Sequence, residues 1–423
     1  MAHEAATNVL DGPDGLASVR GWQEEFYRDL HAHPELPHQE NRTASNVAAR
    51  LREAGLEVHE GIGGTGVVGI LRHGEGPTIL LRADMDALPV REQTGLPYAS
   101  NQTTSDGTPV MHACGHDVHV TCLLGATTLL ARAPAAWSGT LVALFQPAEE
   151  TADGARGMLD DGLADLVGKV DVGMAQHVLP LPAGTVGTRT GPVLSAADSM
   201  KVTLHGRGAH GSMPQASVDP VVLAASIVMR LQTIVAREVA PGDTAVLTVG
   251  SIQAGTKSNV IPDQAVLQLN VRTYDEQTRT AVLAAIERIV RAECIASGSP
   301  QEPEFELFDR YPLTDNDPTV TDRVAAAFAA HFGEHAVELA QQSASEDFSD
   351  IPRALGTPYT YWGIGGIDPD LYRTAEQAGC ISQDIPVNHS ATFAPVLQPT
   401  LDTGTRALVA GALAWLHRSS ATH

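Results

Sequence analysis

The stretch Thr78-Ile-Leu-Leu-Arg82 is a short apolar run that leads directly into Ala-Asp84-Met-Asp86, and it indicates the class of fold. Apolar runs of this length, bounded by glycine and charged turns, are typical of buried strands. The other elements predicted around it are one or two helices within residues 18–55, a strand over 66–71, a helix over 118–131, and strands over 139–145 and 170–177. Strands that alternate with helices predict an α/β sandwich with a largely buried sheet.

The sequence pattern changes near Gly191. The elements predicted beyond it are a half-exposed strand over 199–205, a long apolar helix over 220–239, strands over 244–252 and 264–273, a helix over 276–297 and a strand over 304–308. This β-α-β-β-α-β order is the split, ferredoxin-like arrangement of a small two-layer domain. We therefore predict a discontinuous catalytic α/β/α domain, residues 1–191 and 310–423, with a small α+β domain inserted at 192–309.

The composition is that of a folded globular protein, with 43% hydrophobic and 18% charged residues. A chain of 423 residues exceeds the usual size of a single core, which agrees with two domains. The formal net charge of −23 argues against a nucleic-acid partner, because phosphates would be repelled.

The N-terminus and the cysteines predict the cellular compartment of the protein. The N-terminus lacks a basic segment followed by an apolar one, so no signal peptide is predicted. No apolar run reaches the length that a membrane span needs, so no membrane partner is predicted either. The cysteines have no disulfide-framework spacing: they are Cys114, Cys122, Cys294 and Cys380. A cytoplasmic protein with reduced thiols is the expectation.

Two short segments carry side chains that bind metals. Met111-His-Ala-Cys114-Gly-His116-Asp117 offers a thiol and an imidazole, and Gln146-Pro-Ala-Glu149-Glu150 offers two carboxylates. These are donors that a borderline-soft divalent ion such as zinc accepts. Gly115 would let the backbone turn so that Cys114 and His116 converge. For a single cysteine the simpler explanation is a buried structural thiol. Here several polar residues end predicted strands, and open α/β sheets build their sites at that edge, so the metal site is favoured.

Adjacent glutamates suggest that one binds metal while the other moves protons. Alternatively, Glu149 and Glu150 only complement a helix dipole. His177 and His389 are weak signals individually, since a lone histidine near a strand end is more often a satisfied polar residue than a ligand. His112 and His119 crowd the same loop as Cys114 and are expected to be structural or to support the ligands, because all of these side chains cannot bind one metal.

In the inserted region, Gly206-Arg-Gly-Ala-His210-Gly-Ser-Met-Pro214 is a glycine-rich loop. It lacks the Lys-Ser/Thr ending of a phosphate-binding loop, so that role is not expected. His210, flanked by glycine, is better explained as a group delivered to a substrate. Arg272 ends an alternating strand and could pair bidentately with a carboxylate, although a solvated edge-strand arginine is an equal alternative.

Together these segments resemble the aminoacylase, hippurate hydrolase and indoleacetyl-amino-acid hydrolase family of co-catalytic metallopeptidase-like amidohydrolases. The resemblance is closest to N-acyl-amino-acid aminoacylases of actinobacteria, and it runs nearly from end to end. The matching segments are residues 30–36, 40–43, 82–89, 111–116, 149–150, 206–214, 258–262, 345–348 and His389. After His389 the chain departs from the commoner aromatic and acidic run of the family, because Ser390-Ala-Thr-Phe393-Ala-Pro395 follows.

The resemblance implies two divalent metal ions per subunit, Zn²⁺ first and Mn²⁺, Co²⁺ or Ni²⁺ as alternatives. The implied metal ligands are Cys114, His116, Glu150, His177 and His389. Glu149 would be the general base, and Asp86 would orient ligands without binding metal. The inserted domain would be a dimerisation or lid domain of a homodimer, or of a dimer of dimers. Its His210 would polarise the scissile carbonyl, with Asn259 close by.

The predicted reaction is hydrolysis of the amide bond of a small N-acyl amino acid, in which Glu149 takes a proton from the attacking water. Arg272 or a nearby polar group would hold the carboxylate of the amino acid. A dipeptidase, carboxypeptidase or N-deacetylase on the same dinuclear site is the nearest alternative. A metal-stabilised binding protein and a hydrolase with Cys114 as nucleophile are the others. The last is less favoured because no helix N-terminus or His–Cys pair singles out that thiol.

Overall fold

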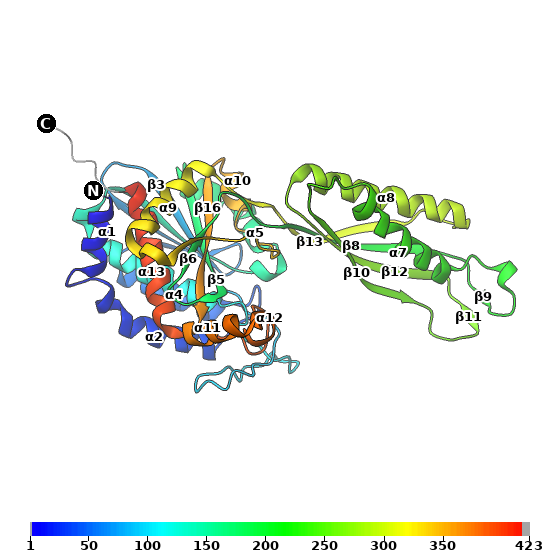
Figure 1. Ribbon diagram of the computed structural model, residues 1–423, viewed down its shortest axis with the longest axis horizontal. Coiled ribbons are helices and arrows are strands. Elements are labelled where there is room, and N and C mark those ends of the chain that lie inside the picture. The colour runs from blue at the N-terminus through cyan, green and yellow to red at the C-terminus, as the bar shows by residue number, and fades with distance from the viewer. Residues whose placement is uncertain (1, 417–423) are drawn as a thin grey trace. The chain divides into compact units, whose positions relative to one another are not determined.

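The computed structural model describes residues 2–416, and within it the chain divides into two compact units (Figure 1). The larger unit contains the chain up to Val193, Asp315–Gln341, and the chain from Asp347 onward. The smaller unit contains Leu194–Thr314 and the short segment Gln342–Glu346. Strands β7 (Gly191–Leu194) and β14 (Thr314–Asn316) lie where the chain passes between the units.

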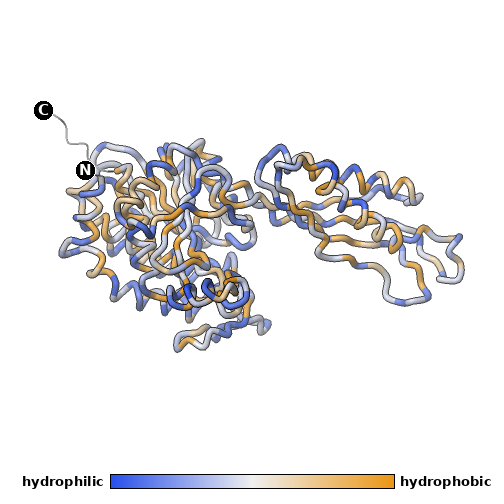
Figure 2. Tube along the Cα trace, viewed as in Figure 1, coloured by the Kyte–Doolittle hydropathy of each residue, from blue (hydrophilic) through white to orange (hydrophobic). Residues whose placement is uncertain are grey.

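The larger unit is built on a mixed eight-stranded sheet of order β1-β2-β4-β3-β5-β16-β6-β15. Its strands are β1 (Glu57–Ile62), β2 (Gly66–His73), β3 (Thr78–Asp84), β4 (Gly139–Gln146), β5 (Val172–Pro182), β6 (Val186–Thr188), β15 (Ala336–Glu338) and β16 (Tyr359–Ile367). The central strands β4, β3, β5 and β16 pair in parallel with one another. Strand β16 comes late in the chain yet lies between β5 and β6. Parallel strands buried on both faces need apolar side chains throughout, and orange hydrophobic colour follows these strands in Figure 2.

Helices cover this sheet. They are α1 (Ala2–Asp11), α2 (Leu16–Ala32), α3 (Asn41–Glu53), α4 (His116–Arg132), α5 (Gly154–Asp160), α6 (Leu163–Val167), α9 (Pro318–Phe332), α10 (Asp350–Ala354), α11 (Pro369–Ala378), α12 (Ile381–Asp384) and α13 (Leu397–Leu416). Helices α4 and α13 are buried along almost their whole length and pack against each other. A helix that is apolar on all sides belongs in the interior, so the start of α4 is fixed firmly in the core.

The smaller unit has the predicted β-α-β-β-α-β order. Its elements are β8 (Ala196–His205), α7 (Pro220–Arg237), β10 (Ala245–Ala254), β12 (Gln264–Thr273), α8 (Glu276–Ser297) and β13 (Glu304–Tyr311). The four strands form an antiparallel sheet of order β10-β12-β8-β13, and both helices pack into its core. Two short strands, β9 (Ala209–His210) and β11 (Val260–Ile261), form a separate ladder. The predicted fold class is confirmed.

The apolar helix α7 corrects one expectation. Among residues 2–416 it is the one helix long and apolar enough to cross a membrane, with a mean hydropathy of 1.4 over 18 residues. The prediction that no segment meets this criterion is therefore wrong by length and composition. Helices that pack in protein cores meet the same test, and α7 buries Leu223, Ile227, Leu231 and Ile234 against the small sheet. One such helix is weak evidence for a membrane.

Candidate metal centre

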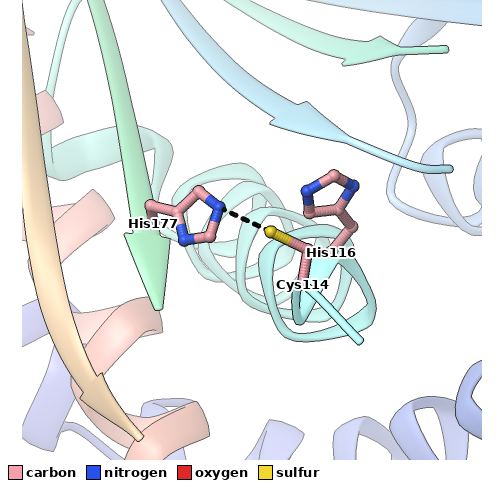
Figure 3. A group of neighbouring side chains, drawn as sticks. All are labelled: Cys114, His116 and His177. Carbon is pink, nitrogen blue, oxygen red and sulfur yellow. Dashed lines mark hydrogen bonds between the residues drawn. The ribbon is translucent and has the colours of Figure 1, made fainter. Parts of the chain in front are cut away.

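Cys114 and His116 lie at the start of α4, where the chain turns sharply (Figure 3). Gly115 between them has φ = +85°, in the left-handed region that favours glycine. A Cβ atom on Gly115 would lie 2.4 Å from Cγ1 of Val178, so a larger residue does not fit there. Both side chains are buried. The turn that the sequence predicted from Gly115 is confirmed, and it aims a thiol and an imidazole at one region.

His177 faces the thiol from strand β5, with its Nε2 3.4 Å from Sγ of Cys114 (Figure 3). Its Nδ1 is 2.8 Å from the carbonyl oxygen of Val178. A carbonyl only accepts, so Nδ1 carries the proton and Nε2 keeps a lone pair that faces Cys114. The sequence placed His177 at the end of a strand, which is wrong: β5 continues to Pro182 and pairs with β16 there.

Glu149 and Glu150 follow strand β4 in a short 3-10 turn, Glu149–Thr151. Glu149 is 5% exposed. Oε1 of Glu150 lies 3.9 Å from Nε2 of His116 and 3.3 Å from Nε2 of His389. Both neighbouring carboxylates therefore lie close to His116.

His389 comes to this region from the C-terminal part of the chain. Its φ is +69°, and its backbone N–H donates to the carbonyl oxygen of Ala113 at 2.8 Å. Hydrogen bonds to Cys114 and Glu150 raise the pKa of His389 to about 10. A cation that binds the imidazole must therefore compete with its proton. By contrast, burial is the main cause that raises the pKa of the Cys114 thiol.

Asp86 touches two of the predicted ligands. Its Oδ1 lies 3.3 Å from Nδ1 of His116, and its Oδ2 accepts the backbone N–H of Glu150 at 2.9 Å. This is the geometry that the predicted orienting role requires. Two more residues in this region were given no specific role by the sequence: His119, whose Nδ1 is 2.5 Å from Oδ1 of Asp84, and Asn388. The available signals were that His119 follows His116 by one helical turn and that Asn388 precedes His389.

The donor atoms fit divalent metal ions. In three groups of side chains the possible ligand atoms all lie within 4.8 Å of one another. These groups are Cys114, His116 and His177; Cys114, Glu150 and His389; and His116, Glu149 and Glu150. Nε2 of His116 is buried and has no hydrogen-bond partner among residues 2–416, whereas Nδ1 of His116 and Oε1 of Glu150 lie 3.3 Å from Oδ1 of Asp86 and Nε2 of His389. Unpaired buried polar atoms are costly, and a metal ion would satisfy them. Cys114 and His116 each belong to two of these three groups. Groups that overlap in this way could hold two neighbouring metal ions.

The structure corrects one reason given against a nucleophilic cysteine. Cys114 does precede the N-terminus of α4, and His177 does lie beside its sulfur. Burial nevertheless raises the pKa of this thiol, whereas a nucleophilic cysteine needs a lowered one. The carboxylate and imidazole groups around Cys114 are also more numerous than a thiol nucleophile requires. The interpretation as a metal site is therefore retained.

Three predicted site residues belong to the smaller unit. His210 is exposed on β9, and its Nδ1 accepts the backbone N–H of Ser212 at 3.1 Å. Its Nε2 therefore carries the proton and can donate a hydrogen bond. The carbonyl oxygen of Asn259 accepts the N–H of Gly211 at 2.8 Å, which keeps Asn259 beside His210.

Arg272 lies on β12, and its Nη1 donates to the carbonyl oxygen of Ser343 at 2.8 Å and to Oγ of Ser345 at 3.1 Å. These bonds fix the orientation of its guanidinium group within the smaller unit. A guanidinium has five N–H donors, so two bonds through one nitrogen do not use up its capacity to bind a carboxylate.

Known proteins share both the sequence and the fold. The family model described as Peptidase family M20/M25/M40 matches residues 80–382. N-acetylcysteine deacetylase of Bacillus subtilis is 38% identical over 344 residues, which cover 81% of this chain and 88% of the relative. Hippurate hydrolase of Campylobacter jejuni is 38% identical over 337 residues, with 79% and 85% covered. Thermostable carboxypeptidase 1 of Saccharolobus solfataricus is 37% identical over 383 residues, with 89% and 91% covered.

A solved structure agrees with these relatives. The dinuclear metal binding peptidase of the M20 family from Bacillus subtilis superposes with a TM-score of 0.76 at 30% identity. The match covers 94% of this chain and 98% of that protein.

Proposed function

The chain belongs to peptidase family M20/M25/M40, and from that premise we propose that it is a metal-dependent amidohydrolase that cleaves N-acyl amino acids into a carboxylic acid and a free amino acid. The observation that carries the proposal is the pair of neighbouring carboxylates beside Cys114 and His116, of which Glu149 is buried and Glu150 partly buried. A protein that only binds a ligand needs no second carboxylate for moving protons, whereas a hydrolase does.

Two divalent ions are the proposed cofactors, held by Cys114, His116, Glu150, His177 and His389. When bound, such ions act as Lewis acids that polarise the substrate carbonyl and make water a stronger acid. The mixture of thiolate, imidazole and carboxylate donors suits zinc, which we propose as the metal, with Mn²⁺, Co²⁺ and Ni²⁺ as alternatives.

Glu149 is the proposed general base. It accepts a proton from the attacking water and returns it to the nitrogen of the leaving amine, so that one carboxylate serves both halves of the reaction. Asp86 holds His116 and the backbone of Glu150 in place during these steps. Its role is to fix the orientation of ligands rather than to bind metal.

The smaller unit supplies the groups that bind the substrate. His210 donates its Nε2–H to the carbonyl oxygen on which negative charge develops, in the site of its own chain or of a second copy. Asn259 lies beside it and assists. Arg272 pairs with the carboxylate of the amino acid product.

A homodimer formed through the smaller unit is part of the proposal. Helix α7 exposes apolar side chains, with Val222 62% and Met229 72% exposed. Strand β10 is an edge strand that pairs only with β12 and exposes Val246 and Ile252. An apolar helix face beside an open strand edge favours association with a second copy.

Light scattering tests the dimer. A variant with both Val222→Lys and Met229→Lys should have half the molar mass of the wild type, because these exposed residues do not support the fold of one chain. Leu371→Lys, which replaces an exposed apolar residue of α11, is the control and should leave the mass unchanged. An unchanged mass in the double variant contradicts this interface.

The cysteines bear on the proposed location. All four are free thiols, and three of them are buried. Free thiols persist in a reducing compartment, so we place the protein in the cytoplasm.

One relative favours a second candidate function. Because thermostable carboxypeptidase 1 matches over 89% of this chain, a peptide substrate on the same dinuclear site is the alternative. The chemistry of the metals and of Glu149 would be the same. The two functions differ only in what the acyl side of the amide carries.

The deciding experiment is hydrolysis of a panel of N-acyl amino acids and dipeptides, with acyl group and amino acid varied. Each substrate is tested with chelated enzyme and with enzyme resupplied with Zn²⁺ or Mn²⁺. We expect N-acyl amino acids to be cleaved, with activity lost on chelation and restored by metal. Cleavage of dipeptides alone would establish the alternative, and activity that survives chelation would overturn the metal mechanism.

A further inference from the structure

The backbone of Val178 is held from three directions by polar side chains. Its N–H donates to Nε2 of His119 at 2.8 Å. Its carbonyl oxygen accepts from Nδ1 of His177, also at 2.8 Å, and from the side-chain amide of Asn388 at 3.1 Å. Val178 directly follows a proposed metal ligand, so any movement of the Val178 backbone also moves His177.

Asn388 connects the backbone of Val178 to the segment that carries Cys114, another proposed metal ligand. Its Nδ2 also donates to the carbonyl oxygen of Cys114 at 3.1 Å. A side-chain amide has two N–H donors, and here each has one backbone carbonyl as partner. Asn388 thus connects the Cys114 turn with strand β5, and it does so from the residue next to His389.

His389 needs such support because its backbone is strained. Its φ of +69° lies in the left-handed region, which is unfavourable for a residue other than glycine. Its own side chain is 55% exposed and so receives little packing. The bonds of Asn388 and the bond from the His389 N–H to Ala113 are what hold the loop in this conformation.

His119 is excluded as a metal ligand by its own hydrogen bonds, although it lies close to His116 and Asp84. The Val178 N–H can only donate, so Nε2 of His119 accepts and Nδ1 carries the proton toward Asp84. Both ring nitrogens are therefore used within the protein. Asp84 is itself paired with the buried guanidinium of Arg82 at 2.6 Å, so the chain of contacts ends in the core.

We propose that Asn388 and His119 are positioning residues that hold the Cys114, His177 and His389 segments around the backbone of Val178 and so set the affinity of the metal centre. The inference rests on the proposed metal-dependent function. It assigns the two residues to the geometry of the ligands and not to the chemical step.

The test measures Zn²⁺ affinity of the full-length protein by competition with a chromophoric chelator. Asn388→Ala removes both donors and should weaken Zn²⁺ binding about 10- to 100-fold, the usual effect of losing a partner that orients ligands. Val387→Ala is the matched control, because Val387 is the preceding residue of the loop and is 52% exposed. The control should bind Zn²⁺ as the wild type does.

Two substitutions separate the bonds of His119. Glutamine places an oxygen near Nε2 and can still accept from Val178, whereas asparagine reaches only toward Asp84. We expect His119→Gln to retain more Zn²⁺ affinity than His119→Asn. The Co²⁺-loaded proteins give a second reading, because the thiolate-to-Co²⁺ absorption of Cys114 should shift in Asn388→Ala and stay unchanged in Val387→Ala.

The outcomes distinguish the inference from the proposed function. If the wild type binds no Zn²⁺ or Co²⁺, the metal-dependent function fails and the inference fails with it. If the wild type binds metal and Asn388→Ala binds equally tightly with the same Co²⁺ spectrum, only the inference is overturned. Thermal melting of the chelated variants shows whether a loss of affinity reflects unfolding, and equal melting temperatures support the positioning role.

Discussion

Two buried clusters of histidine and carboxylate groups meet at the first turn of α4, and they differ in how completely their atoms are paired. In one, Nδ1 of His31 lies 2.7 Å from Asp117 and its Nε2 lies 3.1 Å from Glu92. Both ring nitrogens therefore have partners. In the other, His116 is equally buried and its Nδ1 lies 3.3 Å from Oδ1 of Asp86, yet its Nε2 has no hydrogen-bond partner among the described residues.

The difference separates a structural cluster from a binding site. A buried polar atom without a partner costs stability, so proteins leave few of them unless a ligand completes the set. The His31 cluster is complete within the chain and ties the segment around Glu92 to helix α2. The His116 cluster is complete only when a cation is added. Adjacent residues of one helix, His116 and Asp117, thus serve opposite purposes.

The largest expected effect is on the incomplete cluster. Glu149→Gln should lower turnover by about 10²- to 10⁴-fold, because the general base is lost, while the number of bound metal ions stays the same. Steady-state rates and metal content of the purified variant measure both. Glu150→Gln is the control and should lose metal as well as activity. Near-normal turnover in Glu149→Gln would remove the proposed role of Glu149.

The next effect tests the complete cluster. Burial opposes a charged His31, but hydrogen bonds to Asp117 and Glu92 outweigh it and raise the pKa of His31 from 6.5 to about 10. His31→Gln leaves these carboxylates without a cation, which should cost about 3–5 kcal/mol in the free energy of unfolding. Chemical denaturation at neutral pH measures this loss.

The pH dependence follows from the same shift. Because the folded-state pKa of His31 lies above the unfolded value, its stabilisation is complete below pH 6.5 and is lost as pH rises through about 10. The wild type should lose stability over this range more steeply than His31→Gln. His33→Gln, at the residue that follows helix α2 and has a 44% exposed side chain, is the control and should follow the wild type. Parallel pH profiles for wild type and His31→Gln would contradict this account.

An effect of similar size is expected from completing the His116 cluster. Zn²⁺ at about 1,000 times its dissociation constant should raise the free energy of unfolding by about 4 kcal/mol, because only the folded chain offers the site. The rise should vanish in Cys114→Ala/His116→Ala and persist in His31→Gln. Melting temperatures with and without Zn²⁺ test it. If His31→Gln also loses the rise, the two clusters are not separate.

The smallest effect concerns Arg272, whose Nη1 already donates hydrogen bonds to Ser343 and Ser345. Arg272→Ala should reduce the preference for free-carboxylate substrates over their esters by about 10- to 100-fold, since a hydrogen bond to a charged group contributes about 1.5–3 kcal/mol. Ratios of kcat/KM measure the preference. Arg288→Ala, in an exposed ion pair of the smaller unit, should leave it unchanged. An unaltered preference in Arg272→Ala would leave Arg272 with a structural role.

The fold was predictable where the apolar pattern was strong. The buried strands β3 and β4 and all six elements of the inserted β-α-β-β-α-β arrangement were predicted from apolar runs and periodicity. Strand β1 was missed because Glu57–Ile62 has an exposed and mostly polar pattern, and helix α1 was missed near the N-terminus. Their positions depend on neighbours that local patterns do not reveal.

The site was predictable where the ligands are close in sequence. Cys114, His116 and Glu150 follow from short motifs at strand ends, and the structure brings them together. For His119 the sequence predicted only a structural or supporting role without its partners, and for Asn388 it predicted no role. These roles depend on which nitrogen carries a proton and on loops that meet only in the folded chain. A sequence motif specifies residue types, but it does not specify the direction of the hydrogen bonds that those residues make.

The late position of β16 has a consequence for how the protein is made. Strand β16 inserts between β5 and β6, and His389 follows it, so a ribosome must finish the whole inserted unit before either can take its place. A nascent chain that has emerged only through β13 holds Cys114, His116, Glu150 and His177 but lacks His389, the last of the proposed ligands, and strand β16. The proposed metal centre can therefore be completed only after residue 389 has been synthesised, and chains truncated before β16 are left with an open edge on β5.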